Sequence, residues 1–221
     1  MIPAPVHGRF QHHCAGYNSE FGEIKPKDIE GKEVGVRTYA QTTGLWIRGV
    51  LQHEYGVDLD KVTYLTVDEG HLSELKDPPN CRRLPPGSDI GEMMLKGEVV
   101  ASLMGNDLPK DPRVRTLVPD PHNAAKKWFE REGVVPINHL FVIHEDIHKK
   151  NPEIAREIFR MLVEARNLAP PEALKDLPPM GYEANRKGID MAIQWAFEQK
   201  IIPRRLKLEE LFDDVTASLN V

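Results

Sequence analysis

The chain has 221 residues, of which 40% are hydrophobic and 29% charged, and its formal net charge is −5 at pH 7. This composition is typical of a globular protein with one large domain or two small lobes. Acidic and basic residues are interleaved without a basic stripe, so nucleic acid is not an expected partner.

No stretch of the sequence has the properties of a membrane or export segment. No apolar run approaches the ~18 residues of a membrane span, and the N-terminus lacks the basic start and apolar core of a signal peptide. We therefore expect a cytoplasmic protein, or a periplasmic one if an N-terminal signal has been lost. The two cysteines, Cys14 and Cys81, form no Cys-x-x-Cys motif, and reduced buried thiols are favoured over a disulfide. We expect neither a metal nor a cofactor.

Apolar periodicity and turn residues predict strands that alternate with helices from residue 33 to residue 168. The predicted strands cover 10–17, 33–37, 62–67, 99–104 and 137–143. The predicted helices cover 42–55, a segment capped by Ser88, 121–132, 151–167, 183–199 and 208–219, and a long loop covers 68–86. This alternation is typical of an α/β fold with a mostly parallel sheet and helices on both faces. The helices after residue 168 have no obvious sheet of their own to cover.

The densest polar signal follows the predicted strand 33–37. It is the run Arg37, Thr38, Tyr39, Gln41, Thr42 and Thr43, which opens the next helix. A helix start offers free N–H groups and a positive dipole end, and a guanidinium can hold a carboxylate with two parallel hydrogen bonds. Because ligands of parallel sheets bind at this edge, the run predicts an anion site. The alternative, that Thr42 is only a helix cap and Arg37 a surface residue, stays open.

Two histidine-containing segments are candidates for acid–base chemistry. Glu69 and His71 follow the predicted strand 62–67, where a carboxylate beside an imidazole suits proton transfer near neutral pH. A solvated loop is the alternative for this pair. Asn138 and His139 lie in a predicted crossover strand, so either side chain can face a ligand.

Two further residues are candidates for lining a ligand cleft. His12 lies in the segment His12-His13-Cys14, where strand alternation prevents all three side chains from sharing a face and so disfavours a metal cluster. Trp46 lies about one turn after the predicted helix start and can stack on an aromatic ligand, although a position in the core is equally compatible with the sequence.

The segment from His144 to His148 matches the zinc-protease pattern His-Glu-x-x-His. That pattern works only on a helix, where the imidazoles at i and i+4 share a face. The segment follows a predicted strand and ends just before a new helix start at Asn151, so we interpret the match as coincidental and expect no zinc site.

A resemblance to a known family extends over most of the chain. The segment 31–75, with the run GVRTYAQTTGLW, resembles 4,5-dihydroxyphthalate decarboxylases, and so do the shorter segments 133–139, 181–187, 202–206 and 209–212. The resemblance implies a type II periplasmic-binding-protein-like fold with two lobes. It implies three parts in this chain.

The implied parts are a crossover strand with a remnant of lobe one at 1–17, an α/β lobe two at 18–136, and a return crossover with C-terminal helices of lobe one at 137–221. Family members begin with further βα units, so lobe one is expected to be incomplete and its helices to expose apolar surface. We therefore expect a homo-oligomer, or aggregation of the isolated chain.

The resemblance implies non-oxidative decarboxylation of 4,5-dihydroxyphthalate or a related aromatic carboxylate, and thus a role in phthalate catabolism. The alternatives are a substrate-binding protein of an ABC-type transporter for a small organic anion, or a ligand-sensing module. One fold can host all three, and each takes a small carboxylate ligand.

Overall fold

The computed structural model describes residues 1–70, 74–174 and 177–221, which form two compact units. The first unit comprises residues 1–10, 132–194 and 204–221, and the second comprises 11–131 and 195–203. Residues 195–203, which the resemblance assigns to the C-terminal helices, pack with the second unit. Within the described residues, the structure contains no helix with the length and apolar character needed to span a membrane.

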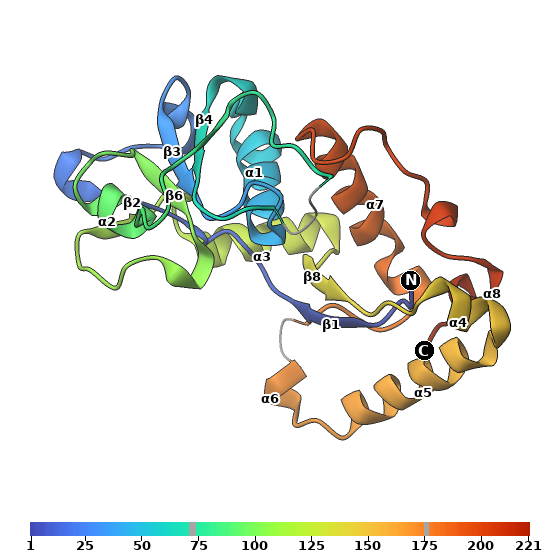
Figure 1. The fold of residues 1–221 in the computed structure, drawn as a ribbon. Coiled ribbons are helices and arrows are strands. Elements are labelled where there is room, and N and C mark those ends of the chain that lie inside the picture. Colours follow the sequence, from blue (N-terminus) through green and yellow to red (C-terminus); the bar gives the residue numbers. More distant parts are fainter. Residues whose placement is uncertain (71–73, 175–176) are drawn as a thin grey trace. The chain divides into compact units, whose positions relative to one another are not determined.

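A six-stranded sheet, counted over the described residues, forms the centre of the second unit (Figure 1). In spatial order its strands are β5 (Cys81–Arg83), β4 (Thr63–Thr66), β3 (Glu33–Val36), β6 (Ala101–Leu103), β2 (Ala15–Asn18) and β7 (Val114–Thr116). β3 pairs in parallel with β4 and β6, and β4 with β5, whereas β2 is antiparallel to β6 and β7. The predicted mostly parallel sheet is confirmed.

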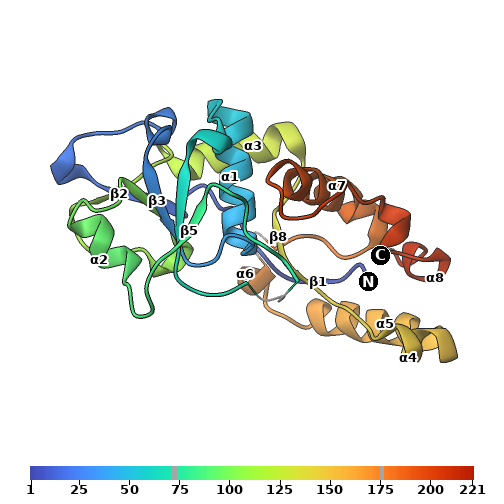
Figure 2. The same ribbon diagram turned by 45° about the horizontal axis from the view of Figure 1, so that its top comes forward.

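Helices cover both faces of this sheet, because alternate side chains of a strand point to opposite sides. They are α1 (Thr42–Tyr55) and α2 (Ile90–Leu95), and α3 (Pro121–Glu132) follows later in the chain. α1 runs alongside the sheet (Figures 1 and 2), and its Arg48 lies 5.5 Å from the centre of the Tyr64 ring on β4. α2 packs on the opposite face, where a Cβ on Gly35 of β3 would come within 2.3 Å of Ile90.

The structure differs from the predicted elements at several places. The predicted strand 10–17 is extended only from Ala15, where β2 begins. The residues before it form a turn in which the Cys14 N–H donates to Gln11 O, and the strand β1 (Pro5–Gly8) lies outside the predicted range. β5 lies inside the predicted loop 68–86, and β7 was not predicted. Both are three-residue strands at the edges of the sheet, and such short strands carry no readable period.

The first unit is built from helices and a two-stranded ribbon. β1 pairs antiparallel with β8 (Ile137–Leu140), which is shorter than the predicted strand 137–143. Its helices within the described residues include α4 (Glu145–Lys150), α5 (Glu153–Asn167), α6 (Pro171–Leu174), most of α7 (Tyr182–Glu198) and α8 (Asp214–Ala217).

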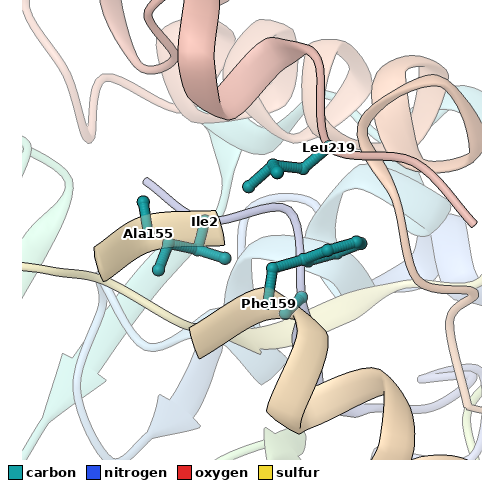
Figure 3. Packing of buried hydrophobic residues seen from close by; sticks show 5 residues of the cluster. Ile2, Ala155, Phe159 and Leu219 are labelled. Atoms are coloured by element: carbon teal, nitrogen blue, oxygen red, sulfur yellow. The ribbon is translucent and has the colours of Figure 1, made fainter. Parts of the chain in front are cut away.

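The core of the first unit forms where the N-terminal segment meets α5. Ile2 packs with Ala155 and Phe159 of α5, and Leu219 joins them from the C-terminal segment (Figure 3). Ala155 and Phe159 lie four residues apart and so share one face of the helix. Residues from both ends of the chain are therefore required to bury the apolar face of α5.

Gly49→Ala is expected to lower the free energy of unfolding by about 1–3 kcal/mol, the range typical of an overpacked core. An added Cβ would lie 1.9 Å from Cε3 of Trp195, whose side chain is buried. The gain in helix propensity from glycine to alanine is about 1 kcal/mol and acts in the opposite direction. Chemical denaturation measures the net change.

Gly188→Ala provides the matched control, because Gly188 also lies inside a helix but has more room. A Cβ there would meet Val134 Cγ1 at 3.1 Å, so we expect stability to be unchanged or slightly higher. Equal losses in the two variants would contradict the packing argument for Gly49.

Candidate functional site

The carboxyl ends of three neighbouring parallel strands meet at Arg37. Arg37 follows β3, and its Nε lies 3.0 Å from Oδ2 of Asp68, which follows β4. Its Nη1 lies 3.8 Å from Oδ2 of Asp107, which follows β6. All three side chains are about half exposed, so each ion pair contributes only about 0–1 kcal/mol. The charge of Arg37 is thus shared with two carboxylates, and the residue is not a free clamp for a ligand.

α1 begins just after this edge with unbonded backbone amides. Gln41 is the N-cap residue, its side chain makes no capping bond, and its carbonyl accepts from the Leu45 N–H at 2.9 Å. Within the described residues, no hydrogen bond is found from the N–H groups of Thr42, Thr43 or Gly44. These N–H groups lie at the positive end of the helix dipole, so the start of α1 can bind an anion.

Buried contacts of Thr38 and Tyr39 hold the loop before α1 in place. Thr38 and Tyr39 are buried, and the Thr38 carbonyl accepts from the Gln41 N–H at 3.2 Å. The Tyr39 hydroxyl donates to the carbonyl of Gln199 at 3.1 Å, and burial raises the pKa of Tyr39. The side chains of Thr38 and Tyr39 therefore support the loop, while Gln41 and Thr42 are half-buried at its surface.

Sequence reasoning missed Arg48, whose side chain is fully buried on α1. Its Nε donates to Gln199 Oε1 at 2.9 Å, and its Nη2 donates to the Tyr39 carbonyl at 2.6 Å. Its Cζ lies 3.9 Å from the centre of the Tyr39 ring, a cation–π contact worth about 2 kcal/mol when desolvated. The apolar positions of this helix could not reveal Arg48, because an arginine beside them is normally expected to face solvent.

Trp46 and His12, two predicted ligand-binding residues, lie in the interior of the second unit. Trp46 has no exposed surface, and its ring packs edge-on to Trp195 with ring centres 5.2 Å apart, which corresponds to the core alternative. His12 packs edge-on to Trp128 at 5.8 Å and lines a cavity of about 300 Å³. Burial lowers the pKa of His12 to about 4, and the charges of neighbouring His13 and Arg131 act in the same direction.

The acid–base candidates are divided between the two units. Glu69 is exposed in the second unit after β4, and His71 lies outside the described residues. Asn138 and His139 are on β8 of the first unit, where His139 pairs in register with His7 of β1. The two imidazole rings have centres 5.6 Å apart, and burial followed by the charge of His139 lowers the pKa of His7. His7 was not among the predicted site residues.

Residues Glu145–Lys150 form the helix α4, so the prediction that this segment is the end of a strand and a short connection to the next helix was wrong. His144 is the N-cap of α4, and its Nδ1 accepts from the Asp146 N–H at 3.3 Å. His148 Nε2 lies 2.5 Å from Oδ2 of Asp213. Burial would raise the pKa of Asp213, but hydrogen bonds from the Thr216 N–H and from His148 outweigh it and lower the pKa to about 2. Both imidazoles therefore have local partners, and no group of three metal-ligating side chains occurs among the described residues.

No family model matches the chain. Among curated proteins, it is 26% identical over 163 residues to a 4,5-dihydroxyphthalate decarboxylase of Comamonas testosteroni, which covers 68% of this chain and 49% of that protein. It is 27% identical over 140 residues to the protein of the same name from Pseudomonas putida, which covers 58% of this chain and 54% of that one. The chain is thus similar in sequence to two 4,5-dihydroxyphthalate decarboxylases.

This similarity confirms the family resemblance of the sequence, although the chain spans about half the length of the curated relatives it matches. Two solved structures are also similar. The alkanesulfonate-binding protein of Xanthomonas axonopodis pv. citri bound to MOPS gives a TM-score of 0.47 at 11% identity, covering 93% of this chain and 71% of that one. The periplasmic aliphatic sulphonate binding protein of Escherichia coli gives 0.48 at 13% identity, covering 95% and 71%.

Zinc is expected not to bind stoichiometrically at His144 and His148. The Nε2 of His148 already contacts Asp213. His144 caps the helix, so the two imidazoles do not share a free helix face. Calorimetric titration with Zn²⁺ measures this directly. Asp213→Asn is a useful comparison, because it weakens the competing contact of His148. One equivalent of zinc bound by the unchanged protein, and lost in His148→Ala, would contradict the expectation.

Proposed function

We propose that the protein acts in the non-oxidative decarboxylation of 4,5-dihydroxyphthalate or a closely related aromatic carboxylate. The observation that carries the proposal is the similarity to two curated proteins of that name. The unbonded helix start of α1 supports it, because the substrate class consists of carboxylates. Aromatic degradation of this kind, in the phthalate branch, would take place in the cytoplasm.

The chemistry defines what such a site needs. Loss of CO2 from a phenolic acid is easier once the ring carbon that bears the departing carboxylate is protonated. A hydroxyl para to that carbon supplies electrons as its proton leaves. The enzyme therefore needs a base for the phenol, an acid for the ring carbon, and donors for the carboxylate that stays. No redox change occurs, so no redox cofactor is required.

The start of α1 suits the retained carboxylate. The N–H groups of Thr42 and Thr43 and the hydroxyl of Thr42 can donate to its oxygens, with Gln41 beside them. Arg37 contributes from the neighbouring strand end, but its contacts with Asp68 reduce its share of the binding energy. We therefore expect Arg37→Ala to weaken ligand binding by about 1 kcal/mol, less than a buried, unshared guanidinium would.

His71 together with Glu69 is our first candidate for proton transfer, and His139 is the second. Glu69 follows β4, the strand next to β3, and His71 comes two residues later in the sequence, outside the described residues. His139 is exposed, and the adjacent His7 places a second imidazole beside it. Asn138 is proposed to contribute to binding rather than to proton transfer. His12 lines a cavity with Glu54 and Tyr55, at the end of α1 opposite the anion site, so it is not assigned to this site.

The decarboxylase assay tests the proposal directly. The protein is supplied with 4,5-dihydroxyphthalate, and CO2 and dihydroxybenzoate are measured. We expect turnover without added cofactor, and a loss of about 10²–10⁴-fold in kcat when the correct acid–base residue is changed, in His71→Ala or His139→Ala. His122→Ala is the control, because His122 is an exposed residue of α3.

The outcomes separate the candidate functions. Tight binding of the diacid without turnover would favour the alternative, a substrate-binding protein of an ABC-type transporter, which needs the anion site but no proton transfer. Turnover that survives both histidine changes would keep the enzyme and remove His71 and His139 as proton donors.

We also propose that the protein self-associates. Met161 of α5 is 56% exposed, and Leu168, just after this helix, is 88% exposed. Light scattering is expected to show an oligomer whose mass falls when both residues are changed to Glu. Phe21→Glu is the matched control, because Phe21 is 64% exposed but lies in the second unit. A monomer at every concentration would contradict the proposal.

A further inference from the structure

We propose that Arg48 determines the preference of the α1 start for ligands of high negative charge, acting through the loop that precedes the helix. Arg48 would be a positioning and specificity residue, since its buried side chain does not reach a ligand. The inference rests on the proposed function in that both place an anion at the start of α1.

The guanidinium of Arg48 lies at the first turn of α1, although the residue itself belongs to the second. A Cβ on Gly44, the third residue of the helix, would lie 2.7 Å from Arg48 Nη1. Nη2 donates to the carbonyl of Tyr39 in the preceding loop. Helical side chains lean towards the N-terminus, which accounts for this position. The positive charge therefore lies beside the first turn of α1, the turn that carries the unbonded N–H groups of Thr42 and Thr43.

The charge of Arg48 is not neutralised by a carboxylate. Within the described residues, its hydrogen-bond acceptors are the neutral oxygens of Tyr39 and Gln199, and its buried Nη1 has no partner. Arg37, a second cation at this edge, is paired with Asp68 and Asp107. Of these two cations, only Arg48 adds an uncompensated positive charge to the dipole of α1.

Burial strengthens this effect. Charges interact more strongly where water is excluded, so the field of a buried guanidinium extends further than that of Arg37 at the surface. A ligand at the helix start would experience this field in proportion to its own charge. A dianion should therefore gain more affinity from Arg48 than a monoanion, and a neutral analogue should gain almost none.

The hydrogen bonds of Arg48 also tie the loop to a distant part of the chain. Gln199 accepts from Arg48 Nε with Oε1, and its Nε2 donates to the carbonyl of Leu45 on α1 at 2.9 Å. Gln199 is itself buried. A carboxylate at position 199 would neutralise Arg48 without removing the guanidinium, which separates the role of the charge from that of packing.

The experiment compares the binding of phthalate, benzoate, benzamide and inorganic sulfate by calorimetry in the intact chain. Arg48→Met is expected to weaken phthalate and sulfate binding about tenfold or more, the size of effect expected for one unit charge at an effective dielectric constant of about 20. Benzamide binding should change little. Arg48→Lys keeps the charge and is expected to restore most of the affinity.

Gln199→Glu serves as a second variant, also for the case that Arg48→Met does not fold. It is expected to reduce phthalate affinity more than benzamide affinity, while Gln199→Met leaves their ratio unchanged. Thermal unfolding of each variant accompanies the titrations. Equal losses for phthalate and benzamide, or equal losses in Arg48→Met and Arg48→Lys, would show that Arg48 is only structural and overturn the inference.

The probes keep this inference separate from the proposed function. Charge-dependent sulfate binding that requires Arg48, in a protein that does not bind phthalate, supports the role of Arg48 and contradicts the proposed substrate. Binding of phthalate and turnover of 4,5-dihydroxyphthalate that are both independent of Arg48 support the proposed function and overturn the inference. A protein that binds neither anion contradicts both.

Discussion

The parallel pairing of β3 between β4 and β6 is the constraint on which the candidate site depends. Parallel strands in register end at the same level, so the residues that follow them emerge at one edge. This is how Arg37, Asp68 and Asp107, far apart in sequence, come within ion-pair distance. α1 begins at the same edge. The register of the strands therefore places the polar loop and the unbonded start of α1 next to each other.

The interior behind this edge contains the buried polar groups of Arg48 and Tyr64, and burying them costs free energy. A buried guanidinium without a carboxylate partner is costly, because desolvation is offset here only by neutral acceptors and aromatic rings. Tyr64, beside Arg48, also has a buried hydroxyl without a partner among the described residues. A core of apolar residues of similar volume would be at least as stable. The proposed role of Arg48, a positive charge near the helix start, would account for a buried guanidinium that stability alone does not require.

The sequence predicts the elements whose signals are local. α1 was predicted with both of its ends, because a polar loop precedes Thr42 and Gly56 adopts the left-handed conformation that ends the helix. The mostly parallel sheet and the helices on both faces also follow from the alternation of strand and helix periods. β5 and β7 could not be predicted, because each has three residues and belongs to an edge of the sheet.

The site was predictable only in part, because burial is decided by tertiary contacts. The polar run from Arg37 to Thr43 identified the edge, but the ion pairs of Arg37 depend on residues more than 30 positions away. Neither the position of Trp46 nor that of Arg48 could be decided from the sequence. The tryptophan, a candidate for ligand stacking, lies in the core, and so does the arginine, a residue type normally placed at the surface. The Trp195 segment, which packs against α1, supplies the surroundings that no local pattern contains.

The burial of each histidine determines whether its imidazole can transfer a proton near neutral pH, which the residue type alone does not decide. A general acid working near neutral pH needs a pKa close to that pH, so that it carries a proton and can release it. Burial lowers the pKa of His12 to about 4, so its imidazole is neutral at pH 7 and cannot act as an imidazolium donor. His12 can still offer one N–H and one lone pair to a bound molecule. In the proposed reaction, proton transfer is therefore assigned to more exposed imidazoles, and His139 is exposed among the described residues.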